Sequence, residues 1–162
     1  MAHLRRAEPQ DAEACWQIRN AAIRDQCHTC YSPSAIEAWT PHAMPDHYRQ
    51  VINEHPFYVM VSPQGQLLAT GFLDCHTQRI EAIFTRPRAM RQGFAAQIIA
   101  KLKQEARQQG WDSVALSATP NAEPFYLKQG FIRLREDRHF SPAAKCYLDC
   151  VEMYCPLPSI ER

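Results

Sequence analysis

Residues 79–110 constrain the fold of this chain more than any other stretch. A β-rich run, Arg79 to Thr85, is followed after Gly93 by a segment with helical periodicity. Its apolar residues recur every four positions and leave polar residues for the other faces: Phe94, Ile98, Leu102 and Ala106. Gly110 stands where a helix of this length would be capped at its C-terminal end. The pattern predicts a strand, a turn and a long amphipathic helix that needs an apolar partner surface.

The rest of the chain continues this mixture of strands and helices. The patterns predict strands at residues 3–8, 57–61, 67–73, 79–85, 114–117, 131–138 and 147–154. Helices are expected from Pro9 to about residue 22, from Ser34 until Pro41 and Pro45 interrupt or end it, after Gly93, and from Asn121 as the N-cap to Gly130. Residues 25–33 are expected as a loop, and Tyr48, Val51 and Ile52 indicate a further helical turn or two. The resulting order is β-α-α-β-β-β-α-β-α-β-β. It indicates a mixed α/β (α+β) fold whose first half is largely antiparallel.

Length and charge narrow the class of protein. The 162 residues fit one domain, residues 1–162, with a core that needs no disulfide or metal. A formal net charge of +1 with dispersed basic residues argues against nucleic acid and membrane surfaces as partners. The chain has no apolar run of membrane-spanning length and no signal-peptide pattern, so we expect a cytoplasmic protein.

The cysteines fit a reducing compartment. There are seven, at irregular spacing, which indicates mostly inert thiols rather than a disulfide framework. Cys27 and Cys30 are the one pair at metal-ligand spacing. Zinc needs about four ligands and no second such pair occurs, so we expect no metal site.

The turn before the long helix has the features of a phosphate-binding loop. The first N–H groups of a helix lack internal partners and carry the positive end of the helix dipole. Gly93 lets an anion approach the backbone without meeting a Cβ atom, and Arg88 and Arg91 add nearby positive charge. A charged cofactor is therefore expected to bind here locally.

A second segment adds to this interpretation. Residues 121–131 read Asn-Ala-Glu-Pro-Phe-Tyr-Leu-Lys-Gln-Gly-Phe. Together with the loop Met90-Arg91-Gln92-Gly93-Phe94-Ala95, they resemble the GNAT acetyltransferase superfamily, which has a Q/R-x-x-G-x-G/A loop and an Asn-led helix ending in Gly-Phe. The resemblance covers residues 57–131 well and the remainder in element order. Met90 departs from it, because the family usually has Arg or Gln there.

The resemblance implies a fold, a cosubstrate and a reaction. The expected fold is a mostly antiparallel sheet of about seven strands with helices on both faces. The implied activity is transfer of an acetyl group from acetyl-CoA to a primary amine by direct attack on the thioester. The residues that the resemblance places around acetyl-CoA are Ile83, Phe84, Thr85, Arg88, Arg91, Gln92, Gly93, Phe94, Ala95, Ala96, Asn121, Phe125 and Tyr126.

Two residues are predicted to move protons. The resemblance makes Tyr126 the general acid for the departing thiolate, a role that a phenol with an ordinary pKa near ~10 can fill. Glu81 is the candidate base, and packing of Tyr126 and a salt bridge of Glu81 with Arg79 are the structural alternatives. Strand alternation predicts that Arg79, Glu81, Ile83 and Thr85 share one face.

The acceptor side is less defined. An unusually aromatic and polarisable region is expected to line the amine site through Cys27, His28, Tyr31 and Trp39, with His42 and His47 in the same group. The sequence leaves open a small-molecule or protein amine, acetyl or longer acyl donors, and a homodimer. The alternative function is a catalytically silent acyl-CoA sensor or partner-binding module.

Overall fold

A single seven-stranded sheet organises the computed structural model, which describes residues 1–158. The strand order is β1-β2-β3-β4-β5-β7-β6. All neighbours are antiparallel except β4 and β5. The strands are β1 His3–Arg6, β2 Phe57–Val61, β3 Leu67–Asp74, β4 Arg79–Thr85, β5 Ser113–Ala118, β6 Ile132–Ser141 and β7 Cys146–Pro156. The predicted fold class is confirmed.

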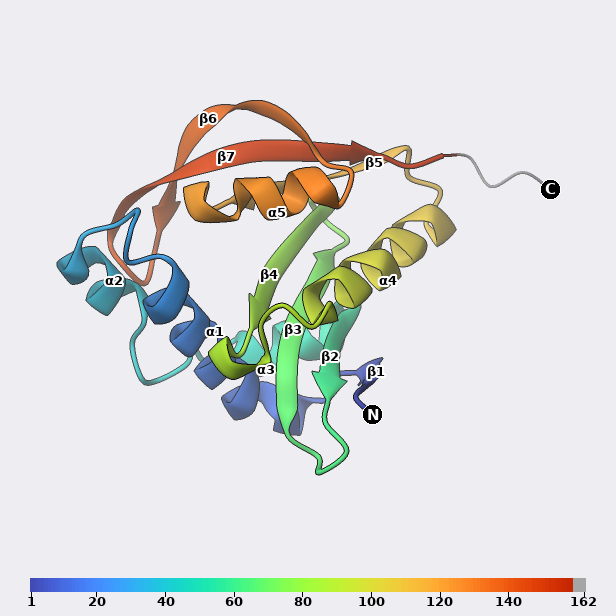
Figure 1. Cartoon of the computed structure of the whole chain (residues 1–162), viewed down its shortest axis with the longest axis horizontal. Helices are drawn as coiled ribbons and strands as arrows, with labels where there is room; N and C mark the ends of the chain where they lie inside the picture. Colours follow the sequence, from blue (N-terminus) through green and yellow to red (C-terminus); the bar gives the residue numbers. More distant parts are fainter. Residues whose placement is uncertain (159–162) are drawn as a thin grey trace.

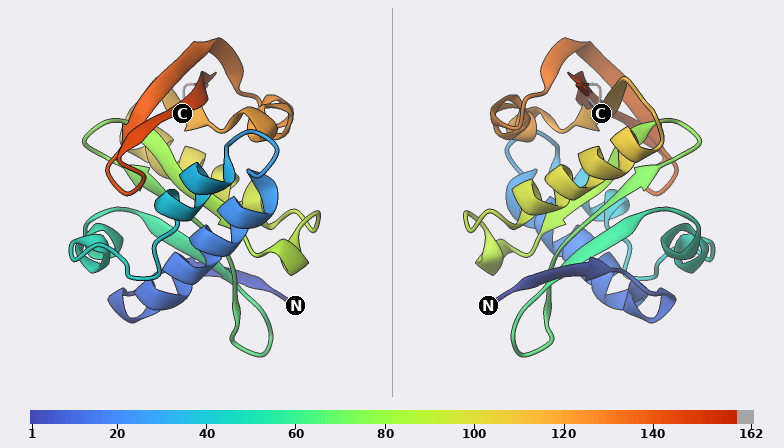
Figure 2. Two further views of the ribbon diagram at one scale, coloured as in Figure 1. Left: turned by 90° about the vertical axis from the view of Figure 1, so that its left-hand side faces the viewer. Right: turned by 90° about the vertical axis from the view of Figure 1, so that its right-hand side faces the viewer.

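Helices cover both faces of this sheet (Figure 1, Figure 2). They are α1 Ala12–Gln26, α2 Pro33–Trp39, α3 Tyr48–Glu54, α4 Phe94–Gln108 and α5 Glu123–Lys128, with 3-10 turns at Pro9–Asp11, Pro87–Ala89 and Pro120–Ala122. The further turn expected near residues 48–52 is a separate helix, α3, so the element order has one helix more than predicted. The predicted loop at residues 25–33 is too long, because α1 continues to Gln26 and α2 begins at Pro33, after the Ser32 side chain caps the Ala35 N–H. No helix within residues 1–158 is long and apolar enough to cross a membrane.

The core divides along the two faces of the sheet. On the α4 face, Ile98, Ile99, Leu102 and Ala106 are buried among side chains of β2, β3, β5 and β7. This confirms the apolar stripe read from the four-residue spacing. On the other face, α1 buries Cys15 and Ile18 against β2 residues. A third cluster joins the end of α1 and α2 to the β6–β7 hairpin.

Strand β4 contains one extra residue relative to β3. Its partners run Phe72 with Glu81 and then Thr70 with Phe84, so two residues of β4 face Gly71 alone. Ala82 takes up the irregularity with a φ of 56°, and its carbonyl accepts a hydrogen bond from Thr70 Oγ1 at 2.9 Å. A β-bulge of this kind reverses the alternation of side chains beyond it.

The bulge corrects the prediction that Arg79, Glu81, Ile83 and Thr85 share a face. Ile83 and Thr85 lie on the α4 face: Ile83 packs into the α4 cluster, and Thr85 pairs with Ala69 of that cluster. Glu81 lies on the α1 face, because it pairs with Phe72, which packs against the α1 cluster. The prediction from strand alternation is wrong here because the pattern of apolar and polar residues contains no sign of the inserted residue.

Strands β4 and β5 diverge from a narrow base. They are parallel neighbours paired in register only at Arg79 and Ala115. Beyond that pair, the carboxyl-terminal half of β4 has no strand partner on this side within residues 1–158. The sheet thus opens between its two halves, and Figure 1 shows β4 running away from β5 toward the turn before α4.

The close approach at Gly71 gives a stability prediction. A Cβ atom there would lie 2.5 Å from Ile83 Cδ1 and 2.7 Å from Ile98 Cγ2. We expect Gly71→Ala to lower the free energy of unfolding by about 1–3 kcal/mol, because the packed core has no room for the methyl group. Urea unfolding would measure the loss, and adding Ile83→Val should recover part of it by removing Cδ1. A Gly71→Ala protein as stable as the parent would show that the bulge and α4 are not held as tightly as described.

Candidate active site

Two neighbouring cavities open where β4 and β5 separate. The first, here called the donor cavity, has a volume of about 260 Å³ and is lined by residues of the end of α1, β4, the following loop, α4, the 3-10 turn before α5 and α5 itself. The second, the acceptor cavity, has a volume of about 480 Å³ and is lined by α1, α2, β4, β5, α5 and the β6–β7 pair. The volume of the second falls in the range of about 300–1,000 Å³ typical of small-ligand sites.

The donor cavity reaches the exposed start of α4. The first backbone hydrogen bond of this helix runs from the Gln97 N–H to the Gly93 carbonyl at 3.1 Å, so the three N–H groups before it have no partner in the helix. Those three residues, Phe94, Ala95 and Ala96, all line the donor cavity. Gly93 has a φ of 83° and no atom within 4 Å of where its Cβ would be. The backbone therefore presents free donors beside open space, which suits an anionic group.

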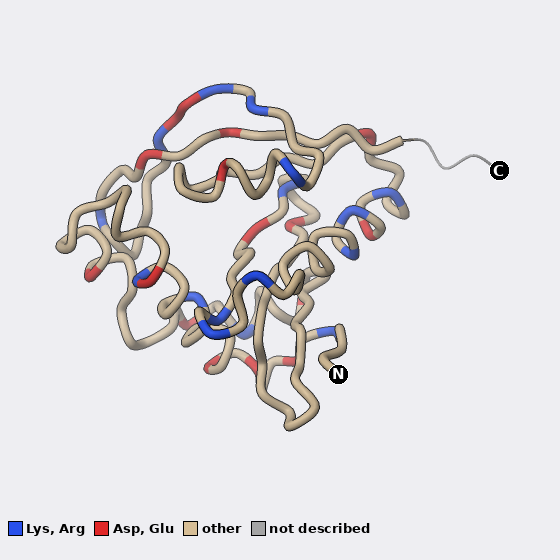
Figure 3. The backbone as a smooth tube through the Cα atoms, viewed as in Figure 1, with Lys and Arg blue, Asp and Glu red and all other residues tan. Residues whose placement is uncertain are grey.

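Arg91 brings positive charge to this helix start. Arg91 lines the donor cavity and also has a left-handed backbone, with a φ of 64°. Figure 3 shows the basic residues of the loop before α4 close to this turn, with the other Lys and Arg residues dispersed over the chain. The positive field at the cavity is local, in keeping with a net charge of +1.

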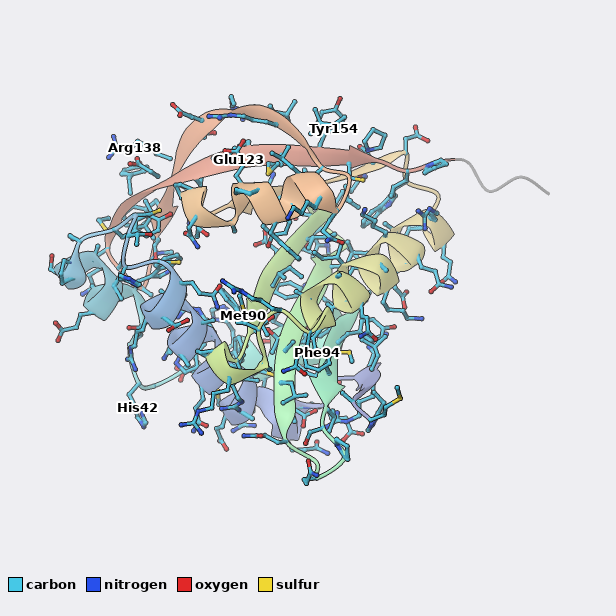
Figure 4. All side chains as sticks on the ribbon, in the orientation of Figure 1. His42, Met90, Phe94, Glu123, Arg138 and Tyr154 are labelled. Atoms are coloured by element: carbon cyan, nitrogen blue, oxygen red, sulfur yellow. The ribbon has the colours of Figure 1, made fainter. Side chains whose placement is uncertain are left out.

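The partly exposed side chain of Met90 contacts helix α1. Its Sδ accepts a hydrogen bond from Gln26 Nε2 at 3.3 Å, and both side chains line the donor cavity. Figure 4 shows Met90 and Phe94 near each other where the loop enters α4. The sequence patterns did not single out Gln26. Its side-chain amide lies beside Met90, whose own side chain has no N–H group.

Five residues line both cavities and form the junction between them: Gln26, Ile83, Asn121, Ala122 and Tyr126. Tyr126 is buried, with edge-on packing against Phe125 and Phe131 at ring-centroid distances of 5.2 and 5.7 Å. Within residues 1–158 no fully buried side-chain polar atom lacks a hydrogen-bond partner, and the hydroxyl of Tyr126, which makes no side-chain hydrogen bond there, is open to the cavities. Burial, and then the negative charge of Glu81, raise the pKa of Tyr126, so the phenol stays protonated at neutral pH.

An arginine and two glutamates line the acceptor cavity. Arg79 Nη2 lies 2.9 Å from Glu152 Oε2 and 2.6 Å from Ser117 Oγ, and the Ser117 hydroxyl donates to Glu152 Oε1. Arg79 Nε is 3.7 Å from Glu81 Oε1, beyond hydrogen-bond distance. Glu152 is thus satisfied by internal donors, whereas Glu81 keeps its lone pairs for another partner.

The environment of Glu81 favours a neutral carboxyl more than water does. Burial raises the pKa of Glu81; the Arg79 charge opposes that rise, and Asp74 and Glu152 add to it. Its side chain is nevertheless 43 % accessible, because it faces the cavity. A carboxylate with a raised pKa that is open to a ligand is suited to accept a proton near neutral pH.

The structure distributes the predicted donor residues unevenly. Ile83, Thr85, Arg91, Gly93, Phe94, Ala95, Ala96, Asn121, Phe125 and Tyr126 line the donor cavity. Phe84 lines the acceptor cavity instead, because the bulge turns it to the α1 face, and Arg88 and Gln92 are exposed outside both cavities. Asn121 lies in a 3-10 turn, and its predicted role as helix cap is wrong, because the residue at the start of α5 is Ala122, with no side-chain cap.

The predicted acceptor residues also separate. Cys27 and Trp39 line the acceptor cavity, whereas His28 and Tyr31 line a shallow outer depression beside α2. His42 and His47 are exposed outside both cavities, and Figure 4 shows His42 on the loop after α2. The sequence patterns missed Ser117, Glu152 and Ile23 as cavity residues. Within residues 1–158 no group of three His, Cys, Asp or Glu side chains is placed to hold a metal ion.

Comparison with known proteins agrees with this geometry. The sequence profile described as acetyltransferase (GNAT) domain matches residues 27–142, and the chain therefore belongs to the GNAT acetyltransferase family. A search among curated proteins found no match.

Several solved structures share the fold. A GCN5-related N-acetyltransferase from Rhodopseudomonas palustris aligns with a TM-score of 0.87 at 20% identity, over 97% of this chain and 96% of that one. YncA, a putative acetyltransferase from Salmonella typhimurium solved with its cofactor acetyl-CoA, gives 0.70 at 16% identity over 100% and 97%. The ribosomal-protein-S18-alanine N-acetyltransferase from Escherichia coli gives 0.67 at 17% identity over 100% and 97%.

Gly93 offers a test of the donor cavity with an internal control. Gly65, in the β2–β3 turn, has a similar φ of 86° and equally open surroundings. We expect Gly93→Ala and Gly65→Ala to lose about 1–2 kcal/mol of stability each, from the left-handed backbone alone. Only Gly93→Ala should weaken coenzyme A binding, by at least fivefold in calorimetry, because its methyl group enters the space beside the free N–H groups. Equal coenzyme A affinity in the two variants would contradict this placement.

Proposed function

We propose that the protein transfers an acetyl group from acetyl-CoA to a primary amine within the junction of the two cavities. The observation that carries the proposal is that Tyr126 and Ile83 line both cavities. A thioester held in the donor cavity and an amine held in the acceptor cavity would meet beside these two residues. Holding two reactants at one place removes much of the entropic barrier to their reaction.

The start of α4 is suited to the phosphates of the cosubstrate. The free N–H groups of Phe94, Ala95 and Ala96 would bind a pyrophosphate, with Arg91 supplying charge. Gln26 would add a side-chain amide where Met90 provides no polar group. The α4 face of β4, with Ile83 and Thr85, would lie along the pantetheine arm, and Asn121 would contact it from the opposite side.

Glu81 and Tyr126 supply the proton chemistry. An amine is protonated in water and must lose its proton before it attacks the thioester carbon; Glu81 would accept that proton directly or through a water molecule. As the carbon–sulfur bond breaks, the protonated hydroxyl of Tyr126 would donate to the departing thiolate. The raised pKa of Tyr126 keeps its proton available throughout the working pH range. Backbone N–H groups beside the bulge would stabilise the oxyanion.

Removal of the Tyr126 hydroxyl tests the acid. We expect Tyr126→Phe to lower kcat at least tenfold, because the thiolate then leaves without a donor, while the affinity for acetyl-CoA changes less than threefold. Steady-state kinetics and calorimetry would measure the two. Phe125→Leu is a matched control in the same cavity: it changes packing and leaves the hydroxyl in place. An unchanged kcat in Tyr126→Phe would remove the general-acid role.

The acidic limb of the pH–rate profile tests the base. In the parent, kcat/KM should rise with pH as Glu81 loses its proton, and Glu81→Gln should flatten this limb and lower kcat/KM at least tenfold at its plateau. Arg79→Met should instead move the limb to higher pH: the guanidinium lowers the pKa of Glu81, so its loss lets that pKa rise further.

These outcomes separate the proposal from its rival. A limb that persists in Glu81→Gln would assign the base to another group. Acetyl-CoA binding without turnover on any amine would instead favour the silent acyl-CoA-binding module.

A further inference from the structure

The acceptor cavity carries an excess of negative charge. Its wall contains two carboxylates, Glu81 and Glu152, one guanidinium, that of Arg79, and the imidazole of His139. Arg79 is committed to Glu152 and Ser117, whose hydroxyl completes the bonding of Glu152. The carboxylate of Glu81 has no hydrogen-bond donor within residues 1–158 and faces the cavity. A cationic group on the ligand would supply the missing partner, whereas an added carboxylate would meet the surplus of the same sign.

Part of the remaining wall is apolar, and the rest carries the polar side chains of Gln26, Thr119, Asn121 and His139. Ile23 and Cys27 come from the end of α1, Trp39 from the end of α2 and Phe84 from β4. None of these side chains brings a charge, and the Trp39 ring packs edge-on against Tyr31 at a centroid distance of 5.4 Å. This surface would bury an apolar group of the acceptor and gain roughly 25 cal/mol for each Å² removed from water.

Hydrogen bonds from α1 fix the position of Trp39. The guanidinium of Arg19 donates to the Trp39 carbonyl at 2.9 Å, and Arg24 donates to the Thr40 carbonyl at 2.8 Å. Both contacts satisfy carbonyl groups at the C-terminal end of α2, where cations are favoured. The apolar wall is therefore rigidly supported, which suits a surface that discriminates between ligands.

The acceptor cavity is closed on the side of α2. The hydroxyl of Tyr31 donates to the Asp149 carbonyl, and Trp39 packs in one cluster with Ala144 and Leu148 of the β6–β7 region. Figure 1 shows α2 and the β6–β7 hairpin meeting at the same edge of the molecule. An extended polypeptide lying across the site would have to displace these contacts. A molecule that fits within about 480 Å³ would not.

We propose that the acceptor is a free small molecule with a primary amine on an apolar body, which places its amino group beside Glu81 and its body against Ile23, Cys27 and Trp39. The inference rests on the proposed acetyl transfer and names the substrate class of the same site. Trp39 acts as a specificity-determining residue, because only an acceptor with an apolar body gains free energy from contact with its ring. The surplus negative charge disfavours substrates that carry a carboxylate beside the amine, and the closed wall disfavours a polypeptide chain.

A panel of four amines tests the class. With saturating acetyl-CoA, we expect kcat/KM for 2-phenylethylamine, expressed per unprotonated amine, to exceed that of three probes at least tenfold. Ethylamine lacks the apolar body, L-phenylalanine adds a carboxylate, and a hexapeptide with a free N-terminus and one lysine adds the chain. A peptide or L-phenylalanine that reacts as well as 2-phenylethylamine would overturn the inference, as would ethylamine at the same efficiency.

Trp39 gives a second readout. We expect Trp39→Ala to reduce the ratio of kcat/KM values for 2-phenylethylamine and ethylamine at least tenfold, mainly through KM. Trp39→Phe, which preserves more of the core, should reduce the same ratio at least twofold. Trp111→Phe is the matched control, because Trp111 packs against the α4 cluster and lines neither cavity. A folded Trp39 variant with an unchanged ratio would remove Trp39 from the acceptor wall.

Measuring acetyl-CoA binding distinguishes a failure of the proposed substrate class from a failure of the proposed acetyl transfer. A thermal shift with acetyl-CoA together with turnover of the peptide alone would overturn the substrate class and leave acetyl transfer standing. The absence of both a thermal shift and turnover of any of the four amines would overturn the proposed function and, with it, this inference. A shift with preferential turnover of 2-phenylethylamine would support both.

Discussion

The extra residue in β4 is the constraint on which the rest of the site depends. Without it, Glu81, Ile83 and Thr85 would point to the same face of the sheet. With Ala82 inserted, one short strand turns Glu81 toward α1 and Ile83 toward α4. The strand can therefore serve both cavities, and the two reactants proposed here would approach it from opposite faces. Gly71 makes this possible, because a side chain there would collide with Ile83.

Burial and one guanidinium, that of Arg79, define the surroundings of the ionisable groups in the site. Arg79 is shared between Glu152, which it contacts closely, and Glu81, which it reaches only at 3.7 Å. Glu152 is thereby fixed as part of the wall, and Glu81 remains available to a ligand. Tyr126 lies where burial and the charge of Glu81 both hold its proton in place. The two groups proposed as acid and base therefore differ in how firmly their surroundings hold a proton.

Much of this could be read from the sequence. The four-residue spacing of Phe94, Ile98, Leu102 and Ala106 predicted α4. The family pattern predicted Gly93 and Tyr126 around acetyl-CoA, and both line the donor cavity. The bulge could not be predicted from the sequence, because the left-handed conformation of Ala82 does not change the pattern of apolar residues. Ser117 and Glu152 lie on different strands, and only the pairing of β5 with β7 brings them together. Asn121 was misplaced as a helix cap because a 3-10 turn precedes α5.

The narrow junction between β4 and β5 has a consequence for cohesion. Register pairing at Arg79 and Ala115 joins the half-sheet β1–β4 to the half-sheet β5–β7–β6, and the cavities lie along the same seam. Beyond Arg79 and Ala115, no strand pairing joins β4 to β5 within residues 1–158. Local separation of the two half-sheets therefore breaks few backbone hydrogen bonds. A ligand held by residues of both halves adds contacts between them. Its binding free energy therefore adds to the resistance of the molecule to splitting, and amide hydrogen exchange along both strands becomes a measure of occupancy.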